Sequence, residues 1–193
     1  MVDLMAEGVI IAAGYSSRAE GWKPGFRLGG KTLIDHCIEG MYPFCSRIVV
    51  VGGYRFTALA RIVEKYERVE LCYNRHFEAG MFSSVVAGFQ QMRKPGFFYL
   101  PGDVPLVSQG VYAKLLQAKG EIVIPAVRGM TGHPVLFRQT DVKKTLRAFS
   151  YQSLREYINS QPHTIVDVHD PGILSDLDTP EDYRQMLKRF ESR

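Results

Sequence analysis

The sequence predicts an α/β fold with a mostly parallel sheet. Short apolar runs alternate with helix-length amphipathic segments along the chain, which is typical of strands joined by crossover helices. The early runs VIIAA, IVVVG and FFYL are nearly continuous rather than alternating, as a sheet covered on both faces requires. No repeat or long Pro/Gly/Ser linker divides the 193 residues. We therefore expect a single domain, 1–193, with a three-layer, Rossmann-like sheet and helices on both faces.

Each element is predicted from its own pattern. Apolar runs predict strands at Gly8–Ala13, Arg47–Val51, Val69–Tyr73, Phe97–Leu100, Ile122–Ile124, Val135–Phe137 and Thr164–Val168. Amphipathic segments predict helices at Leu33–Met41, Thr57–Tyr66, Ser83–Met92, Gln109–Lys119, Asp141–Phe149, Leu154–Asn159 and Glu181–Phe190. Thr32 with Asp35, and Thr179 with Asp182, have capping-box spacing, and Pro180 suits a first helical turn.

Composition excludes several classes of protein. Hydrophobic residues make up 46% and charged residues 23%, with a net charge of +4, which is typical of a soluble globular chain. The basic excess is dispersed, so it favours anionic small molecules over a nucleic acid. No apolar run approaches the ~20 residues of a membrane span, and Met1–Glu7 has two acids and no base. We expect a cytoplasmic protein with no membrane contact.

The cysteines point to no disulfide framework and no zinc cluster. Cys37, Cys45 and Cys72 form an odd, widely spaced set without a CxxC pair. We therefore expect them to be reduced, mostly buried thiols.

The loop after the first strand has the composition of a phosphate cradle. Small residues let the backbone approach a phosphate and aim N–H groups at its oxygens, and two basic side chains balance its charge. The residues are Ala12, Ala13, Gly14, Ser16, Ser17, Arg18 and Lys23. A plain strand-to-loop turn with two solvated bases would have the same composition.

Two familiar phosphate motifs do not apply here. The dinucleotide fingerprint G-x-G-x-x-G is absent, because Gly14 has no further glycines at the required spacing. In contrast, Gly25–Thr32 matches G-x-x-x-x-G-K-[ST] letter for letter. A P-loop must follow a buried strand, and the residues before Gly25 include Trp22, Lys23 and Pro24. We interpret this match as accidental and the segment as a turn leading into a helix capped by Thr32.

Carboxylates at strand ends suggest a cation site. Asp103 ends a buried strand between two prolines, in PGDVP. Magnesium prefers one or two protein carboxylates together with substrate phosphates, so a second acid is expected from Asp176 or Asp178 in DLDTP. The alternative for each aspartate is a structural role in a turn or an N-cap.

Two further loops carry polar groups. Asn74–Ser84 follows a strand and opens a helix, where Gly80, Ser83 and Ser84 offer N–H groups and hydroxyls to a nucleotide or an anion. The alternative is a capped helix with Met81 and Phe82 in the core. His133, in Gly132–Pro134, could contact a ligand, although a loop histidine beside a proline is more often structural.

Taken together, the chain resembles the MobA-like nucleotidyltransferases, and most closely the MocA type, the molybdenum cofactor cytidylyltransferases. The resemblance covers essentially the whole chain. It is carried by IAAGYSSR with Lys23, LGGKTLIDH, NRHFEAGMFSS, PGDVPLV, PAVRGMTGHPVLF and DLDTPEDY. Six ordered blocks are a specific signal, although each is weak alone.

The resemblance implies a nucleotidyltransferase fold and transfer of a nucleoside monophosphate to a phosphorylated pterin, molybdopterin, with pyrophosphate leaving. It implies that Ala12–Arg18 and Lys23 hold the triphosphate, with Arg18, Lys23 and Asp103 catalytic. Asp103 would bind Mg²⁺ with Asp178, or alternatively Asp176. Asn74, Gly80, Ser83 and Gly102 would border the nucleotide. Transient contact with a molybdoenzyme or its chaperone would follow.

The choice of base rests on one residue. Guanine-using relatives tend to have glycine where this chain has Ala13, so the resemblance favours CTP. The chain also departs from the family pattern: Glu20 places an acid near the expected phosphates, and Ser150–Arg155 lacks the usual glycine-and-aspartate loop. Alternatives are the same reaction with another base or acceptor, such as guanylyl transfer, and a non-catalytic nucleotide-binding accessory protein for molybdoenzyme maturation.

Overall fold

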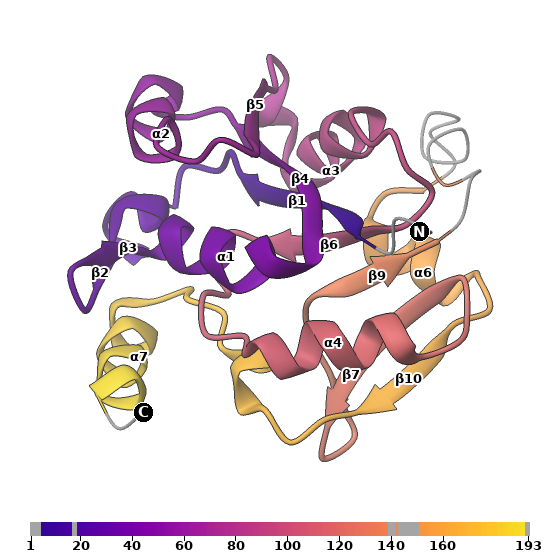
Figure 1. Ribbon diagram of the computed structural model, residues 1–193. Helices are drawn as coiled ribbons and strands as arrows, with labels where there is room; N and C mark the ends of the chain where they lie inside the picture. Colours follow the sequence, from indigo (N-terminus) through magenta and orange to yellow (C-terminus); the bar gives the residue numbers. More distant parts are fainter. Residues whose placement is uncertain (1–4, 17–18, 139–141, 143–150, 192–193) are drawn as a thin grey trace.

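A central mixed sheet organises the chain in the computed structural model, which describes residues 5–16, 19–138, 142 and 151–191 (Figure 1). The sheet has eight strands in the order β10-β7-β9-β6-β1-β4-β5, with β8 paired to β7. The strands are β1 (Ala6–Ala12), β4 (Cys45–Gly52), β5 (Val69–Tyr73), β6 (Phe97–Pro101), β7 (Ile122–Val127), β8 (Met130–Thr131), β9 (Val135–Phe137) and β10 (Thr164–Asp167). The predicted mostly parallel α/β sheet is confirmed.

The direction of the strands places a crevice at the middle of the sheet. β1 runs parallel to β4 on one side and to β6 on the other, with Ile11 opposite both Val51 and Pro101. The chain passes from β1 to β4 and β5 before it returns to β6, so the strand order reverses between β1 and β6. Ligands of open α/β sheets bind at such switch points, beyond the carboxyl ends of the strands. β9 is antiparallel to both β6 and β7.

The helices follow the amphipathic pattern closely. They are α1 (Leu33–Met41), α2 (Phe56–Val63), α3 (Met81–Gln90), α4 (Gln109–Gln117), α6 (Leu154–Asn159) and α7 (Pro180–Glu191). α1 and α6 begin and end as predicted, while α3 begins two residues earlier than the pattern indicated. Apart from Val142, the helix predicted at Asp141–Phe149 lies outside the described residues.

Alternating strand residues build a core on each face of the sheet. Ile10 of β1 packs in a cluster with residues of α1, α2 and α4. Val9 and Ile11 join a separate cluster with residues of α3 and α6. Because both faces are covered, every residue of β1 is buried, which explains its continuous apolar run.

The segment that matches the P-loop pattern is a hairpin in the structure. A 3-10 turn (Lys23–Gly25) precedes β2 (Arg27–Leu28) and β3 (Lys31–Thr32), which pair antiparallel. Gly29 and Gly30 have φ values of 52° and 84°, which favour glycine at a tight turn. Leu28 packs with Met186 of α7 in a third small core. The interpretation of the P-loop match as accidental is confirmed.

The cysteines are free thiols, as expected. Cys37 and Cys45 are buried, and Cys72 is half-buried. Within the described ranges, every helix is too short or too polar to cross a bilayer.

Both predicted capping boxes are present. The backbone N–H and the hydroxyl of Thr32 donate to Asp35 Oδ2 at 2.9 and 2.7 Å, and Asp35 N–H donates back at 3.2 Å. Thr179 and Asp182 repeat the arrangement at the start of α7. Asp35 also accepts a hydrogen bond from Tyr66 and pairs with Lys65, each at 2.9 Å.

We expect Asp35→Asn to make the stability of the fold less dependent on pH. Burial alone would raise the pKa of Asp35, but hydrogen bonds from Lys65, Thr32 and Tyr66 lower it from 3.8 to about 2. A carboxyl group whose pKa is lower in the folded than in the unfolded protein stabilises the fold at pH values above its unfolded pKa. This stabilisation is lost as the pH falls toward the folded pKa of about 2. The variant should lose about 2 kcal/mol at pH 7, and roughly half of that difference should disappear by pH 3.

Urea unfolding followed by circular dichroism at pH 7 and pH 3 measures this difference. Glu39→Gln on the same helix is the control, because Glu39 pairs with Lys31 at the surface and should contribute less than ~1 kcal/mol. A wild-type-to-Asp35→Asn difference that stays constant between the two pH values would contradict the prediction.

Candidate functional site

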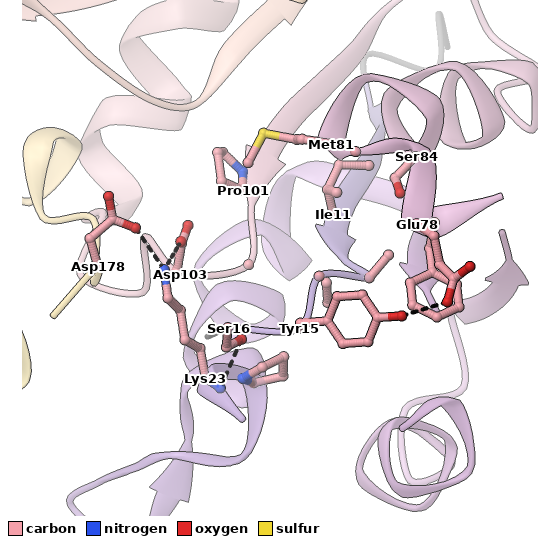
Figure 2. A pocket seen from close by; sticks show the side chains of 17 residues that line it. Ile11, Tyr15, Ser16, Lys23, Glu78, Met81, Ser84, Pro101, Asp103 and Asp178 are labelled. Carbon is pink, nitrogen blue, oxygen red and sulfur yellow. Dashed lines mark hydrogen bonds and ion pairs between the residues drawn. The ribbon is translucent and has the colours of Figure 1, made fainter. Parts of the chain in front are cut away.

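A cavity of about 480 Å³ opens at the carboxyl ends of β1 and β6. Its lining comes from the loop after β1, the 3-10 turn at Lys23, the start of α3, the turn after β6 and the segment before α7 (Figure 2). Of the residues singled out in the sequence, it includes Ala12, Ala13, Gly14, Ser16, Lys23, Gly80, Gly102, Asp103 and Asp178. Segments far apart in the sequence therefore converge at the switch point.

Lys23 lies between two carboxylates at one end of this cavity (Figure 2). Its Nζ is 3.0 Å from Asp103 Oδ2 and 2.9 Å from Asp178 Oδ1. The lysine side chain is 12% exposed, so the cluster is largely shielded from solvent. Burial alone would lower the pKa of Lys23, but the two carboxylates outweigh it and raise the pKa.

Backbone contacts bring the two aspartates together. Gly102 N–H donates to the carbonyl of Ile11 at 2.8 Å, and a Cβ at Gly102 would lie 2.9 Å from that oxygen, so only glycine fits this turn. Leu177 N–H donates to the carbonyl of Asp103 at 3.1 Å, which anchors the neighbouring Asp178. Asp176 is exposed and does not line the cavity.

The loop after β1 leaves space for a ligand. Nothing lies within 4 Å of the position that a Cβ would take at Gly14, although Gly14 lines the cavity. Ser16 has a φ of 59°, and its hydroxyl accepts the Lys23 N–H at 3.2 Å. Ser17 and Arg18, predicted to contact the triphosphate, lie outside the described residues. Glu20 is exposed and does not line the cavity.

Asn74 and Ser83 buttress the site without lining it. Asn74 is 4% exposed, and its amide donates to the hydroxyls of Ser83 and Ser84, each at 2.9 Å. Ser83 donates in turn to the carbonyls of His76 and Gly80. These bonds hold the start of α3, so that Gly80 and Ser84 face the cavity. A direct nucleotide contact by Asn74 or Ser83 stays a prediction.

Sequence reasoning missed the pair formed by Tyr15 and Glu78. The Tyr15 hydroxyl donates to Glu78 Oε1 at 2.6 Å across the cavity wall (Figure 2), and this bond raises the pKa of Tyr15. The Tyr15 ring packs on Tyr54 and Phe77, with centroids 5.0 and 5.3 Å apart. Both residues belong to the two loops singled out in the sequence, but no local pattern indicates that they meet. Met81 is 62% exposed rather than part of the core.

The charges around the cavity are unbalanced. Among its described lining residues, Glu78, Asp103 and Asp178 are acidic and Lys23 alone is basic. The described residues contain no cluster of three or more His, Cys, Asp or Glu side chains that could hold a metal. Asp103 and Asp178 are instead both paired with the ammonium of Lys23.

The chain matches a known protein family along most of its length. The family model described as MobA-like NTP transferase domain matches residues 8–165. The chain is 26% identical to molybdenum cofactor cytidylyltransferase of Escherichia coli over 94% of its length and 95% of that protein. It is 25% identical to a probable molybdenum cofactor guanylyltransferase of Chloroflexus aggregans, over 95% and 94% of the two chains. A nucleotidyl transferase from Methanothermobacter thermautotroptrophicus has the same fold, with a TM-score of 0.83, 19% identity and coverage of 97% and 98%.

Proposed function

Because the chain belongs to the MobA-like NTP transferase domain family, we propose that it transfers CMP from CTP to the phosphate of molybdopterin and releases pyrophosphate. One observation carries the proposal. Lys23, Asp103 and Asp178 meet at the end of a cavity that opens at the switch point of the sheet. The cytidylyltransferase and guanylyltransferase relatives support the class of reaction.

Charge requires a cation to accompany the nucleotide. A triphosphate would meet three carboxylates and one ammonium among the described lining residues. The negative phosphates and the negative carboxylates would repel each other strongly in a site that is shielded from water. Asp103 and Asp178 would hold Mg²⁺, which prefers one or two carboxylates plus substrate phosphates. When bound, Mg²⁺ neutralises charge on the reacting phosphates. The ammonium of Lys23 is then available to a phosphate oxygen.

The reaction needs no nucleophile from the protein. An oxygen of the acceptor phosphate attacks the α-phosphorus of CTP, the bond between the α-phosphorus and its bridging oxygen to the β-phosphate breaks, and pyrophosphate carries the electron pair away. The chain contributes position and charge, which dominate phosphoryl-type transfers. The thiols of Cys37 and Cys45 are buried, burial raises the pKa of each, and neither lines the cavity. They remain protonated and inert.

A coupled assay tests the proposal directly. Purified protein is incubated with Mg²⁺, molybdopterin and each of the four nucleoside triphosphates, and pyrophosphate release is followed. We expect release with CTP only when molybdopterin is present. Release that is fastest with GTP would assign guanylyl transfer instead, and the absence of release with any triphosphate would overturn the proposed reaction.

Ala13→Gly is expected to relax the choice of base. Ala13 is 2% exposed and is one of the residues that line the cavity, and its methyl group would narrow the space against a purine. A methyl group is worth ~1–3 kcal/mol of discrimination, so the ratio of kcat/KM for CTP to that for GTP should fall about tenfold. Ala6→Gly is the control, because Ala6 is buried at the other end of β1. An unchanged ratio in the Ala13 variant would show that this methyl group does not read the base.

A further inference from the structure

The third core of the fold is built from the same stretches of chain as the charged cluster of the site. Lys23, Asp103 and Asp178 lie in the loop after β1, the turn after β6 and the segment before α7. The buried side chains of this core are those of Ala19, Leu28, Leu33, Leu106, Leu177 and Met186. All six are at most 3% exposed. In the sequence, members of the core flank Lys23, follow Asp103 and directly precede Asp178.

Helix α7 packs on this core together with the β2–β3 hairpin (Figure 1). Met186 is the buried residue of α7, whereas Tyr183, Leu187 and Phe190 are partly buried against the core. The Phe190 ring covers the turn of the hairpin, because a Cβ at Gly29 would lie 2.3 Å from it. The helix and the hairpin are therefore packed as one unit.

A chain of contacts leads from α7 to Lys23. The Tyr183 hydroxyl donates to the carbonyl of Arg27 at 2.7 Å. The ring of Tyr183 packs on that of Phe26, with centroids 4.9 Å apart. Phe26 N–H donates in turn to the carbonyl of Lys23 at 3.0 Å, which closes the 3-10 turn. The turn that carries the lysine is thus held against α7 through the hairpin.

The start of α7 holds the two carboxylates. Asp178 N–H donates to Asp182 Oδ2, in the first turn of the helix, at 3.1 Å. Leu177, the residue before Asp178, is buried in the third core, and its N–H donates to the carbonyl of Asp103 at 3.1 Å. The helix therefore contacts the cluster from both sides, the lysine through the hairpin and the aspartates through residues 177 and 178.

We infer that α7 sets the spacing of Lys23, Asp103 and Asp178, with Met186 and Tyr183 as positioning residues. Met186 fills the core that the three segments share, and Tyr183 connects the helix to the lysine turn. Neither lines the first cavity or a second one of about 690 Å³ between α3 and α6, so both act through the charged cluster. This inference rests on the proposed function, because the cluster is assigned to that reaction.

Precise spacing matters for a reaction that depends on position and charge. A displacement of about 1 Å among reacting groups can lower turnover about 10²-fold. Close-packed protein interiors transmit such displacements, because a side chain that is removed leaves a gap into which its neighbours move only in part. A change in the third core should therefore affect the cluster more than an equal change in a core elsewhere in the fold.

Two substitutions test the inference. Met186→Ala opens a gap in the third core, and Met186→Leu refills most of it as a volume-conserving exchange. Tyr183→Phe removes the hydroxyl that donates to Arg27 but keeps the ring on Phe26. Met92→Ala is the matched control. Met92 is 2% exposed in the core shared by α3 and α6, so the same side chain is removed from a buried position away from the cluster.

Three readouts separate positioning from general stability: Tm, kcat for pyrophosphate release at saturating substrates, and affinity for Mn²⁺ in the presence of CTP. Met186→Ala and Met92→Ala should each lower Tm by about 5–15 °C. At a temperature where all variants are folded, kcat and Mn²⁺ affinity should fall at least ~tenfold and ~threefold in Met186→Ala. Both should stay within about threefold and twofold of wild type in Met92→Ala and Met186→Leu. Tyr183→Phe should lower kcat about threefold to tenfold with a Tm shift below about 5 °C.

Equal losses of kcat in Met186→Ala and Met92→Ala, or wild-type kcat and Mn²⁺ affinity in Met186→Ala, would overturn the inference. If Met186→Ala does not fold, Tyr183→Phe decides, and unchanged kcat and Mn²⁺ affinity in that variant would overturn it. Failure of the proposed function is distinct. Wild type that binds Mn²⁺ with CTP but releases no pyrophosphate would refute the reaction, while a loss of Mn²⁺ affinity in Met186→Ala but not in Met92→Ala would still support positioning by α7. Wild type that neither binds Mn²⁺ with CTP nor releases pyrophosphate would overturn both.

Discussion

Replacing Asp103 with asparagine is expected to lower CTP-dependent pyrophosphate release at least about 10³-fold. The site loses a carboxylate that would hold the cation, and the cation neutralises the negative charge of the transferring phosphate. Asp103 lies where β6 ends, with its carboxylate 3.0 Å from Lys23 Nζ. Asparagine has the same shape but binds a divalent cation much more weakly than a carboxylate does. The affinity for Mn²⁺ in the presence of CTP should fall together with turnover.

The fold should tolerate this change. The Asp103 side chain is 20% exposed, and Lys23 keeps its pair with Asp178 at 2.9 Å. The free energy of unfolding should therefore stay within about 1 kcal/mol of the wild-type value, as measured by urea denaturation.

Asp176→Asn is the informative control for Asp103→Asn. Asp176 is the alternative second metal ligand that the sequence left open, yet it is exposed and lies outside the cavity lining. Its substitution should leave turnover within about threefold of wild type. Near-wild-type turnover in Asp103→Asn, or a loss in Asp176→Asn that equals it, would refute the role of the Asp103 and Asp178 pair.

The sequence predicts the larger elements well because each is long enough to show its period. The apolar runs at Val69–Tyr73 and Val135–Phe137 are strands with those bounds, and α1 begins at the predicted capping box. β2, β3 and β8 were missed because each has two residues. A strand of that length is too short to show an alternating pattern.

The candidate site was predictable only in part, and the reason is long-range pairing. Lys23, Asp103 and Asp178 each lie in a recognisable loop, but the sequence could not choose between Asp176 and Asp178. The choice depends on the hydrogen bond from Leu177 to the carbonyl of Asp103, a contact between distant segments. Nor does any sequence pattern indicate that the amide of Asn74 donates to two serines, and a contact between Asn74 and a nucleotide stays a prediction.

Lys23→Met is expected to separate metal binding from nucleotide binding. The ammonium of Lys23 is 3.0 and 2.9 Å from the two carboxylates, in the position that a shared cation would take. Without nucleotide, a divalent ion must compete with this ammonium for Asp103 and Asp178. Methionine removes the competitor and leaves two partly buried carboxylates that repel each other.

Two opposite changes should therefore appear in the same Lys23→Met variant. The affinity for Mn²⁺ in the absence of nucleotide, measured from the electron paramagnetic resonance signal of free Mn²⁺, should rise at least ~tenfold. Pyrophosphate release should fall by about 10²–10³-fold, because the triphosphate loses a preorganised positive charge.

Lys31→Met serves as the control, since Lys31 pairs with Glu39 at the surface and lines neither cavity. It should change neither measurement. Equal Mn²⁺ affinity in wild type and Lys23→Met would mean that the two carboxylates are not where a divalent ion binds. Retained turnover would mean that the lysine holds the aspartates in place without acting on the phosphates. The joint outcome, tighter metal binding with lost catalysis, is what distinguishes a lysine that exchanges places with a metal from one that only stabilises the fold, because a purely structural ion pair would lose stability without gaining affinity for Mn²⁺.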